Sequence, residues 1–138
     1  MTTSPASDLE TFLQRVPYVR FLGMHAELAG DEMTAILPFD PKLIGNRMAD
    51  ALHGGVLGAF METTALAQLA LSGDLPRLPK TIDVTIEYLK VGRALDTYAR
   101  ADLRKVGRRI ANVHVEAWQE NRSQPVAALR GHFLLPQE

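Results

Sequence analysis

The stretch ALHGGVLGAFMETTALAQLAL, residues 51–71, is the most apolar part of this chain and constrains its fold most strongly. It approaches the length of a membrane span, but its histidine, glutamate and glutamine would be costly to place in lipid. It therefore predicts a buried core helix from about Gly54 to Leu71, ending at Ser72-Gly73. Because a helix that is apolar nearly all round must be enclosed on most sides, we expect a curled sheet and a second subunit to cover it.

The rest of the chain predicts a short helix and a series of strands. Apolar spacing indicates a helix over about 7–16, capped by Ser7 or Asp8 and ended by Pro17. Residues 39–52 are expected to form a loop, and strands are expected at 21–29, 32–38, 81–89, 96–106, 109–120 and 125–135. This order predicts one α+β domain over residues 1–138, with an antiparallel sheet covered by one long helix.

The strand TIDVTIEYL, residues 81–89, alternates strictly between apolar and polar side chains. Because successive side chains of a strand point to opposite faces, one face should carry Ile82, Val84, Ile86 and Tyr88. The opposite face should carry Thr81, Asp83, Thr85 and Glu87.

Composition excludes several classes of function. The net charge of −1 gives no reason to expect nucleic acid or an anionic membrane as the main partner. The chain has no cysteine, which excludes a disulfide framework, a thiolate zinc site and a cysteine nucleophile. Its four histidines lack metal-ligand spacing, and it has neither a P-loop nor a G-x-G-x-x-G motif, so we expect neither metal nor cofactor. It has no G-x-S-x-G motif, which disfavours a serine nucleophile. The N-terminal residues lack the pattern of a secretory signal, which predicts a cytoplasmic protein.

Glu62 is the residue of the central helix that most strongly suggests chemistry. An unpaired buried carboxylate either shifts its pKa or costs several kcal/mol, so a functional role is the favoured interpretation. Gly54 and Gly55 fall at the helix N-terminus, where N–H groups lack partners and can act as an oxyanion hole. Glu62 could then attack a carbonyl or activate a water.

The separation of these two groups predicts an assembly. Gly54 and Glu62 are eight residues apart, so along an α-helix they are separated by roughly 12 Å. One carbonyl cannot meet both within a single chain, whereas two antiparallel copies of the helix would bring Gly54 of one near Glu62 of the other. The site therefore predicts a dimer.

The residues VPYVRFLGMHAE, LIGNRMADALHGGVLGAFMETTALA and TIDVTIEYLKVGRA together resemble the hotdog-fold acyl-CoA thioesterases of the PaaI-like, phenylacetate-type branch. By this resemblance, Gly54 polarises the thioester carbonyl, and Glu62 of the opposite subunit is the nucleophile or general base. Asn46 would help to place the thioester or water, Thr81 would orient the water, and His53 would support the loop.

The resemblance also implies a fold, a substrate and an assembly. It implies a long helix wrapped by an antiparallel sheet, a homodimer that pairs into a homotetramer, and an acyl-CoA substrate. Two departures from the family pattern are visible. Glu62 stands where the branch more often has Asp, and the spacing from Asn46 to His53 is one residue longer than in relatives. Because this fold also serves acyl-CoA sensors and hydratases or dehydratases, both remain alternatives.

Further residues are candidates for substrate contact. Gly55 lies beside the oxyanion glycine, and Met61, Phe60 and Met48 suggest an apolar acyl pocket. The segment 90–109 carries seven basic residues and two acids, a net charge of +5. It is either a solvated hairpin or a site for the phosphates of coenzyme A, for which the candidates are Arg93, Arg104, Arg108 and Arg109.

Overall fold

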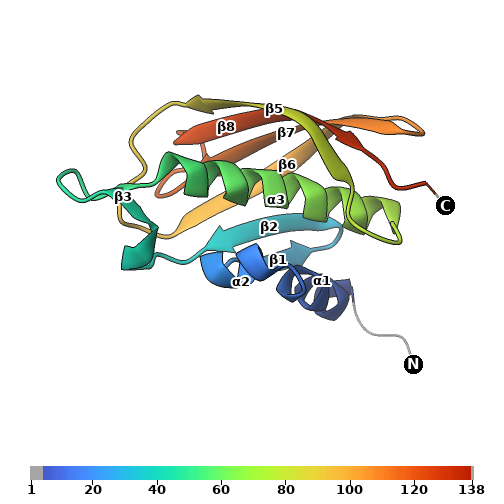
Figure 1. Ribbon diagram of the computed structural model, residues 1–138, viewed down its shortest axis with the longest axis horizontal. Coiled ribbons are helices and arrows are strands. Elements are labelled where there is room, and N and C mark those ends of the chain that lie inside the picture. Colours follow the sequence, from blue (N-terminus) through green and yellow to red (C-terminus); the bar gives the residue numbers. More distant parts are fainter. Residues whose placement is uncertain (1–4, 138) are drawn as a thin grey trace.

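The computed structural model describes residues 5–137, and the side chains of residues 9–137. One long helix, α3 (Gly54–Gly73), lies along the inner face of a six-stranded antiparallel sheet (Figure 1). The strands, in spatial order, are β1 (His25–Ala29), β2 (Glu32–Leu37), β6 (Thr97–Val106), β7 (Ile110–Trp118), β8 (Ala127–Leu134) and β5 (Lys80–Tyr88). This arrangement confirms the predicted helix wrapped by a curved sheet.

The inner face of the sheet is built to receive the helix. Alternate residues of β7 and β8 are buried, as expected for a sheet with one face on the core. Many of the inward side chains are fully buried alanines, namely Ala35, Ala99, Ala111, Ala117 and Ala127. Small side chains leave room for large ones opposite, and Phe60 and Met61 of α3 fill this space with no exposed surface.

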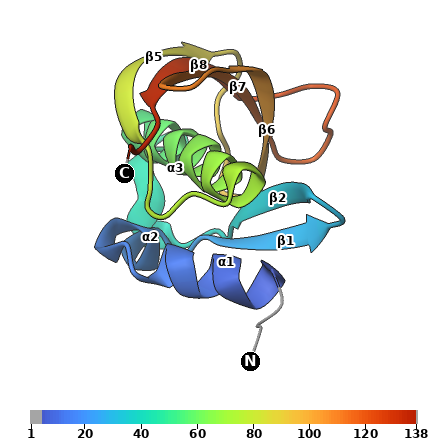
Figure 2. The same cartoon turned by 90° about the vertical axis from the view of Figure 1, so that its right-hand side faces the viewer.

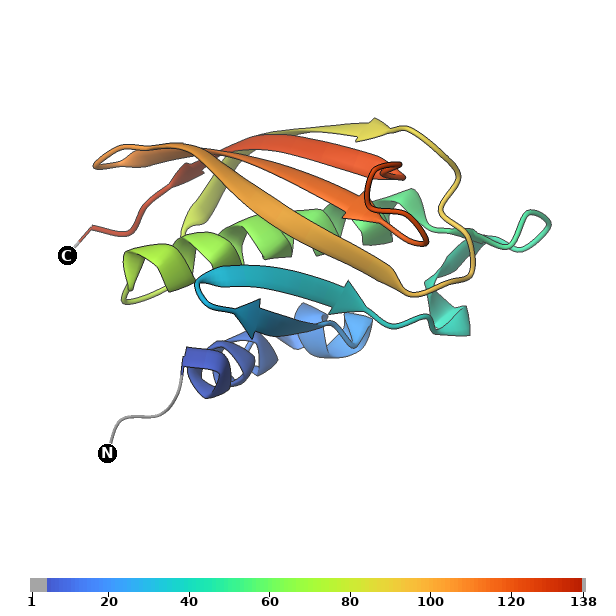
Figure 3. The ribbon, with the colours of Figure 1, turned by 180° about the vertical axis from the view of Figure 1, so that it is seen from behind.

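The helix α3 is long and apolar enough to cross a membrane by length and composition, but 56% of its apolar window is buried inside the fold. Seen from behind, the sheet covers one side of it (Figure 3). Two N-terminal helices, α1 (Pro5–Gln14) and α2 (Pro17–Leu22), lie under another side (Figure 2). The prediction of a core helix is confirmed.

Several predicted boundaries are wrong near the N-terminus. Residues 21 and 22 belong to α2 rather than to a strand, because Pro17 opens a new helix at its favoured first position. The first helix begins at Pro5, so Ser7 and Asp8 lie inside it and do not cap it. Residues 39–52 are not only a loop, since they contain a 3-10 turn, η1 (Pro41–Leu43), and a small hairpin, β3 (Ile44–Asn46) with β4 (Ala51–Leu52).

A β-bulge interrupts the alternation of β5. Thr81 pairs with Phe133, and the next pair is Asp83 with His132, so Ile82 is an extra residue in the ladder. Phe133 is fully buried against the helix, and its neighbour Thr81 therefore faces α3 as well. The prediction that Thr81 shares a face with Asp83, Thr85 and Glu87 was wrong, because strict alternation does not survive an inserted residue.

Candidate active site

The β3–β4 hairpin delivers His53 to the start of α3. Its backbone N–H donates to the carbonyl of Leu43 at 2.9 Å, and the chain passes Gly45 so closely that a Cβ there would lie 2.7 Å from the His53 Cα. His53 is the N-cap residue, and its ring Nδ1 accepts a hydrogen bond from the N–H of Gly55 at 2.9 Å. The ring therefore satisfies one of the free N–H groups of the first turn.

The N–H of Gly54 is left open by this cap. Within residues 5–137, none of the hydrogen bonds formed uses it. Since the N–H of Gly55 donates to His53, Gly54 carries the N–H that remains available at the start of α3. A carbonyl oxygen approaching the start of α3 would meet the Gly54 N–H and the positive end of the helix dipole.

Tyr88 is the residue at this site that sequence reasoning missed. Its hydroxyl donates to the Gly54 carbonyl at 2.8 Å, and its ring lies where a Gly54 side chain would be, 3.2–3.3 Å from an ideal Cβ. The lack of a side chain at Gly54 thus makes room for Tyr88. The signal in the sequence was a large aromatic residue at the end of the apolar face of a strand.

Glu62 lies two turns further along α3. Its side chain is half-buried rather than enclosed, and one carboxylate oxygen accepts a hydrogen bond from the Thr81 hydroxyl at 2.6 Å. The β5 bulge is what brings Thr81 to this position. A carboxylate held by one neutral donor keeps its other lone pairs free to accept a proton or attack a carbonyl carbon.

Asn46 and Met48, two further residues predicted to serve the site, lie in the β3–β4 hairpin rather than beside Glu62. Asn46 is exposed, and its side-chain oxygen accepts from the N–H of Met48, which closes the tip of the β3–β4 hairpin. Met48 is 99% exposed, whereas Phe60 and Met61 are fully buried in the core, so these three do not line one pocket.

The basic segment divides into paired and unpaired residues. Arg93, Arg100 and Arg104 each contact a carboxylate, on Glu120, Glu32 and Asp102 respectively, at 2.7–2.8 Å. Arg104 follows Asp102 onto the sheet face opposite α3, so the structure does not bring it near Glu62. Among the described residues, no ion pair is formed by Lys105, Arg108 or Arg109.

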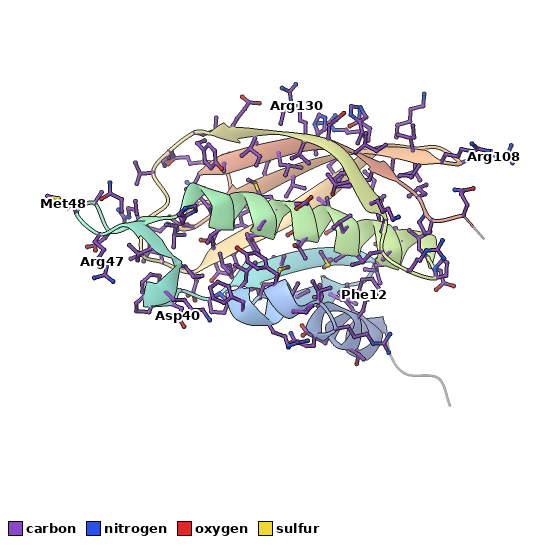
Figure 4. All side chains as sticks on the ribbon, viewed as in Figure 1. Phe12, Asp40, Arg47, Met48, Arg108 and Arg130 are labelled. Carbon is purple, nitrogen blue, oxygen red and sulfur yellow. The ribbon has the colours of Figure 1, made fainter. Side chains whose placement is uncertain are left out.

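Lys105, Arg108 and Arg109 lie around the β6–β7 turn, far from Gly54 of the same chain. Lys90, which also forms no ion pair among the described residues, lies after β5 and shares a cavity wall with Gly54. Figure 4 shows Arg108 at one end of the molecule and Arg47 and Met48, of the hairpin before α3, at the other.

One flank of α3 lies between β5 and α2 (Figure 2) and keeps exposed surface. Apart from its two ends, the less buried positions of α3 are on this flank: Gly55, Ala59, Glu62, Thr63 and Leu66. The neighbouring edge strand β5 and the segment after it expose apolar side chains: Ile82 51%, Val84 36%, Tyr88 54%, Leu89 50% and Val91 63%. An unpaired strand edge with exposed apolar side chains is typical of an interface.

A cavity of about 390 Å³ adjoins the start of α3. Gly54 and Tyr88 form part of its wall, and the rest comes from Ala51, Leu52, Leu57, Leu89, Lys90, Val91 and Gly92. A larger cavity of about 710 Å³ lies elsewhere, with Arg100, Arg104 and Arg130 among several acidic residues. Within the described part of the chain, no group of three His, Asp or Glu residues is placed to hold a metal ion.

Comparison with known proteins decides the family. The thioesterase superfamily model matches residues 50–126, which include the start of α3, Glu62 and Thr81. The chain belongs to the thioesterase superfamily. Among curated relatives of this thioesterase-superfamily protein, the Escherichia coli K12 medium/long-chain acyl-CoA thioesterase YigI is 30% identical over 127 residues, which cover 80% of this chain and 81% of that protein.

Solved structures agree with the fold. A Chromobacterium violaceum protein is 35% identical, with a TM-score of 0.77 over 95% of this chain and 91% of that one. A phenylacetic acid degradation-related protein from Ralstonia eutropha JMP134 shares the fold at 19% identity, with a TM-score of 0.76 over 90% and 99% of the two chains. The resemblance to hotdog-fold thioesterases is confirmed, and with it the expectation of an enzyme that cleaves thioesters.

Proposed function

We propose that this thioesterase-superfamily protein hydrolyses acyl-CoA to a free carboxylic acid and CoA. The observation that carries the proposal is the Glu62 carboxylate, held by Thr81 on the open flank of α3 in a chain of this family. The named activity of the Escherichia coli relative supports an acyl-CoA substrate and makes medium and long acyl chains the first to test.

The reacting carbonyl would be bound between two protomers. Gly54 and Glu62 are separated by roughly 12 Å along one helix, so they cannot meet at one atom in a single chain. The strand β5 runs antiparallel to α3, with Tyr88 bonded to Gly54 and Thr81 bonded to Glu62. If two β5 edges pair antiparallel about a two-fold axis near Val84, Tyr88 of one protomer comes opposite Thr81 of the other, and Gly54 comes opposite the second Glu62.

The chemistry follows from this placement. The Gly54 N–H donates to the thioester oxygen and stabilises the negative charge that develops there. Glu62 of the partner either takes a proton from water, whose oxygen attacks the carbonyl carbon, or attacks that carbon itself to form an anhydride that water then cleaves. In both routes the C–S bond breaks and the electron pair leaves with the sulfur of CoA. Thr81 holds one oxygen of Glu62, so that the other faces the substrate.

The phosphates of CoA are assigned to Arg108 and Arg109 rather than to Arg93 and Arg104. The latter two already have carboxylate partners, whereas the β6–β7 turn has none among the described residues. In the antiparallel dimer this turn extends from the Glu62 side of the site, near the partner's Gly54. We place the active dimer in the cytoplasm and expect it to pair into a tetramer.

The test is a thiol-release assay against acyl-CoAs of increasing chain length, comparing the wild type with Glu62→Gln. Gln keeps the shape and removes the base, so we expect kcat to fall by about 10² or more, the usual scale for a general base. Glu116→Gln, on the outer sheet face, is the matched control and should match the wild type. If the wild type binds acyl-CoA without releasing thiol, the protein is a sensor and the proposed function is wrong.

A further inference from the structure

The peptide group that joins Gly54 to Gly55 is held at both ends. Its oxygen accepts from the Tyr88 hydroxyl at 2.8 Å, and its N–H donates to the His53 ring at 2.9 Å. The two partners come from different parts of the fold, since His53 follows the β3–β4 hairpin and Tyr88 ends β5.

Two adjacent glycines are the most freely rotating pair that a chain can place at a helix start. A donor that stabilises an oxyanion must instead point in one direction before the reaction. It lowers the barrier because the N–H already faces the oxygen and need not reorient in the transition state. The rotation about the Gly54 Cα sets the angle between the open N–H of Gly54 and the peptide group that follows. Fixing that peptide group at both ends therefore restricts the direction of the Gly54 N–H.

We infer that Tyr88 is a positioning residue for the oxyanion donor, with His53 as its counterpart on the other side of the same peptide group. Tyr88 acts through Gly54, by hydrogen-bonding to its carbonyl and by placing its ring in the space that a side chain at Gly54 would occupy. This inference rests on the proposed function for its catalytic consequence but not for its structural one.

The inference also explains a link between the site and the edge of the sheet. Tyr88 is 54% exposed on the strand that is proposed to pair with a second copy. Pairing of β5 would hold Tyr88 in place, and Tyr88 would hold Gly54. Assembly of the dimer would then order the oxyanion donor as well as bring the second Glu62 to it.

The test is Tyr88→Phe, which keeps the ring and removes the hydroxyl, with Tyr98→Phe on the outer sheet face as the matched control. We expect kcat of Tyr88→Phe to fall about three- to tenfold, the scale of one neutral hydrogen bond, with KM within twofold of the wild type. Amide exchange at Gly55, whose N–H donates to His53, should become faster when followed by NMR. Tyr98→Phe should leave kcat, KM and amide exchange as in the wild type.

A second pair of variants tests the other end of the peptide group. His53→Asn keeps a side-chain acceptor at the N-cap and should retain most of the activity, whereas His53→Ala should lose kcat as Tyr88→Phe does. Unchanged kcat and unchanged amide exchange in Tyr88→Phe would overturn the inference. If the wild type proves to have no thioesterase activity, the proposed function fails, and amide exchange alone decides whether Tyr88 restrains this peptide group.

Discussion

Glu62 owes its setting to one hydroxyl group on a neighbouring strand. The Thr81 hydroxyl donates to the carboxylate at 2.6 Å and holds one oxygen in place while the other remains available. A neutral donor of this kind orients the carboxylate and leaves its charge uncompensated, unlike the arginines that neutralise carboxylates elsewhere in the molecule.

Thr81→Val removes this hydrogen bond and keeps the shape of the side chain. Because a hydrogen bond to a charged group is stronger than a neutral one, we expect kcat to fall about tenfold or more, with little change in KM. Thr81→Ser should restore most of the rate. Thr85→Val, in the same strand but on the outer face, should behave as wild type in the same steady-state assay.

The Gly54 N–H can be removed without disturbing the helix. Gly54 is the first residue of α3, where proline is well tolerated, and His53 has the extended backbone that a following proline requires. Gly54→Pro should therefore fold, while kcat falls by about 10²–10³, as for the loss of one oxyanion donor. Gly54→Ala adds the same Cβ at 3.2–3.3 Å from Tyr88 but keeps the N–H, so its smaller loss of kcat measures the steric part. Circular dichroism with kinetics tests this, and a folded Gly54→Pro variant with near wild-type kcat would exclude the Gly54 N–H from the reaction.

At the scale of the element, β5 combines a bulge, an open edge and the contacts to both proposed reactive residues, Gly54 and Glu62. A charged side chain on such an edge is a common natural means of preventing strand pairing. Val84→Lys should therefore weaken the dimer and make activity depend on protein concentration, whereas Thr85→Lys, on the opposite face, should not. Sedimentation velocity measures the dimer fraction of both variants. An unchanged dimer in Val84→Lys would exclude β5 as the interface.

The β6–β7 turn is the element assigned to the CoA phosphates. Alanine at both Arg108 and Arg109 should raise KM for acyl-CoA and weaken its dependence on salt, because exposed charge pairs are screened. An acyl-pantetheine, which lacks the nucleotide, should not distinguish this variant from the wild type. Arg104→Ala is the control, since Arg104 already pairs with Asp102. Equal KM values for all the variants would show that the turn does not bind CoA.

At the scale of the whole molecule, the shared site can be tested by complementation. Mixing Glu62→Gln with Gly54→Pro yields heterodimers in which one site combines an intact Gly54 with an intact Glu62. Random re-assortment should restore about a quarter of wild-type activity, because half of the dimers are mixed and each has one working site. If each site lay within one chain, mixing two inactive variants would restore nothing.

The amino-acid sequence by itself determined the long core helix, the antiparallel sheet, and Gly54 and Glu62 as reactive candidates. These features depend on local periodicity, on motif spacing and on the cost of placing a carboxylate in an apolar helix, all of which can be read along the chain. The prediction of a partner subunit likewise follows from the rise per residue of a helix.

Other features were decided only by the tertiary structure. The bulge at Ile82 turned Thr81 toward Glu62, and no rule of alternation predicts where a strand gains a residue. Tyr88 meets Gly54 across 34 positions of sequence because β5 folds back along α3. Arg100 pairs with Glu32 because β6 lies beside β2, and Arg93 pairs with Glu120 across 27 positions of sequence. These contacts join distant segments, and their energies depend on positions that only the folded chain sets.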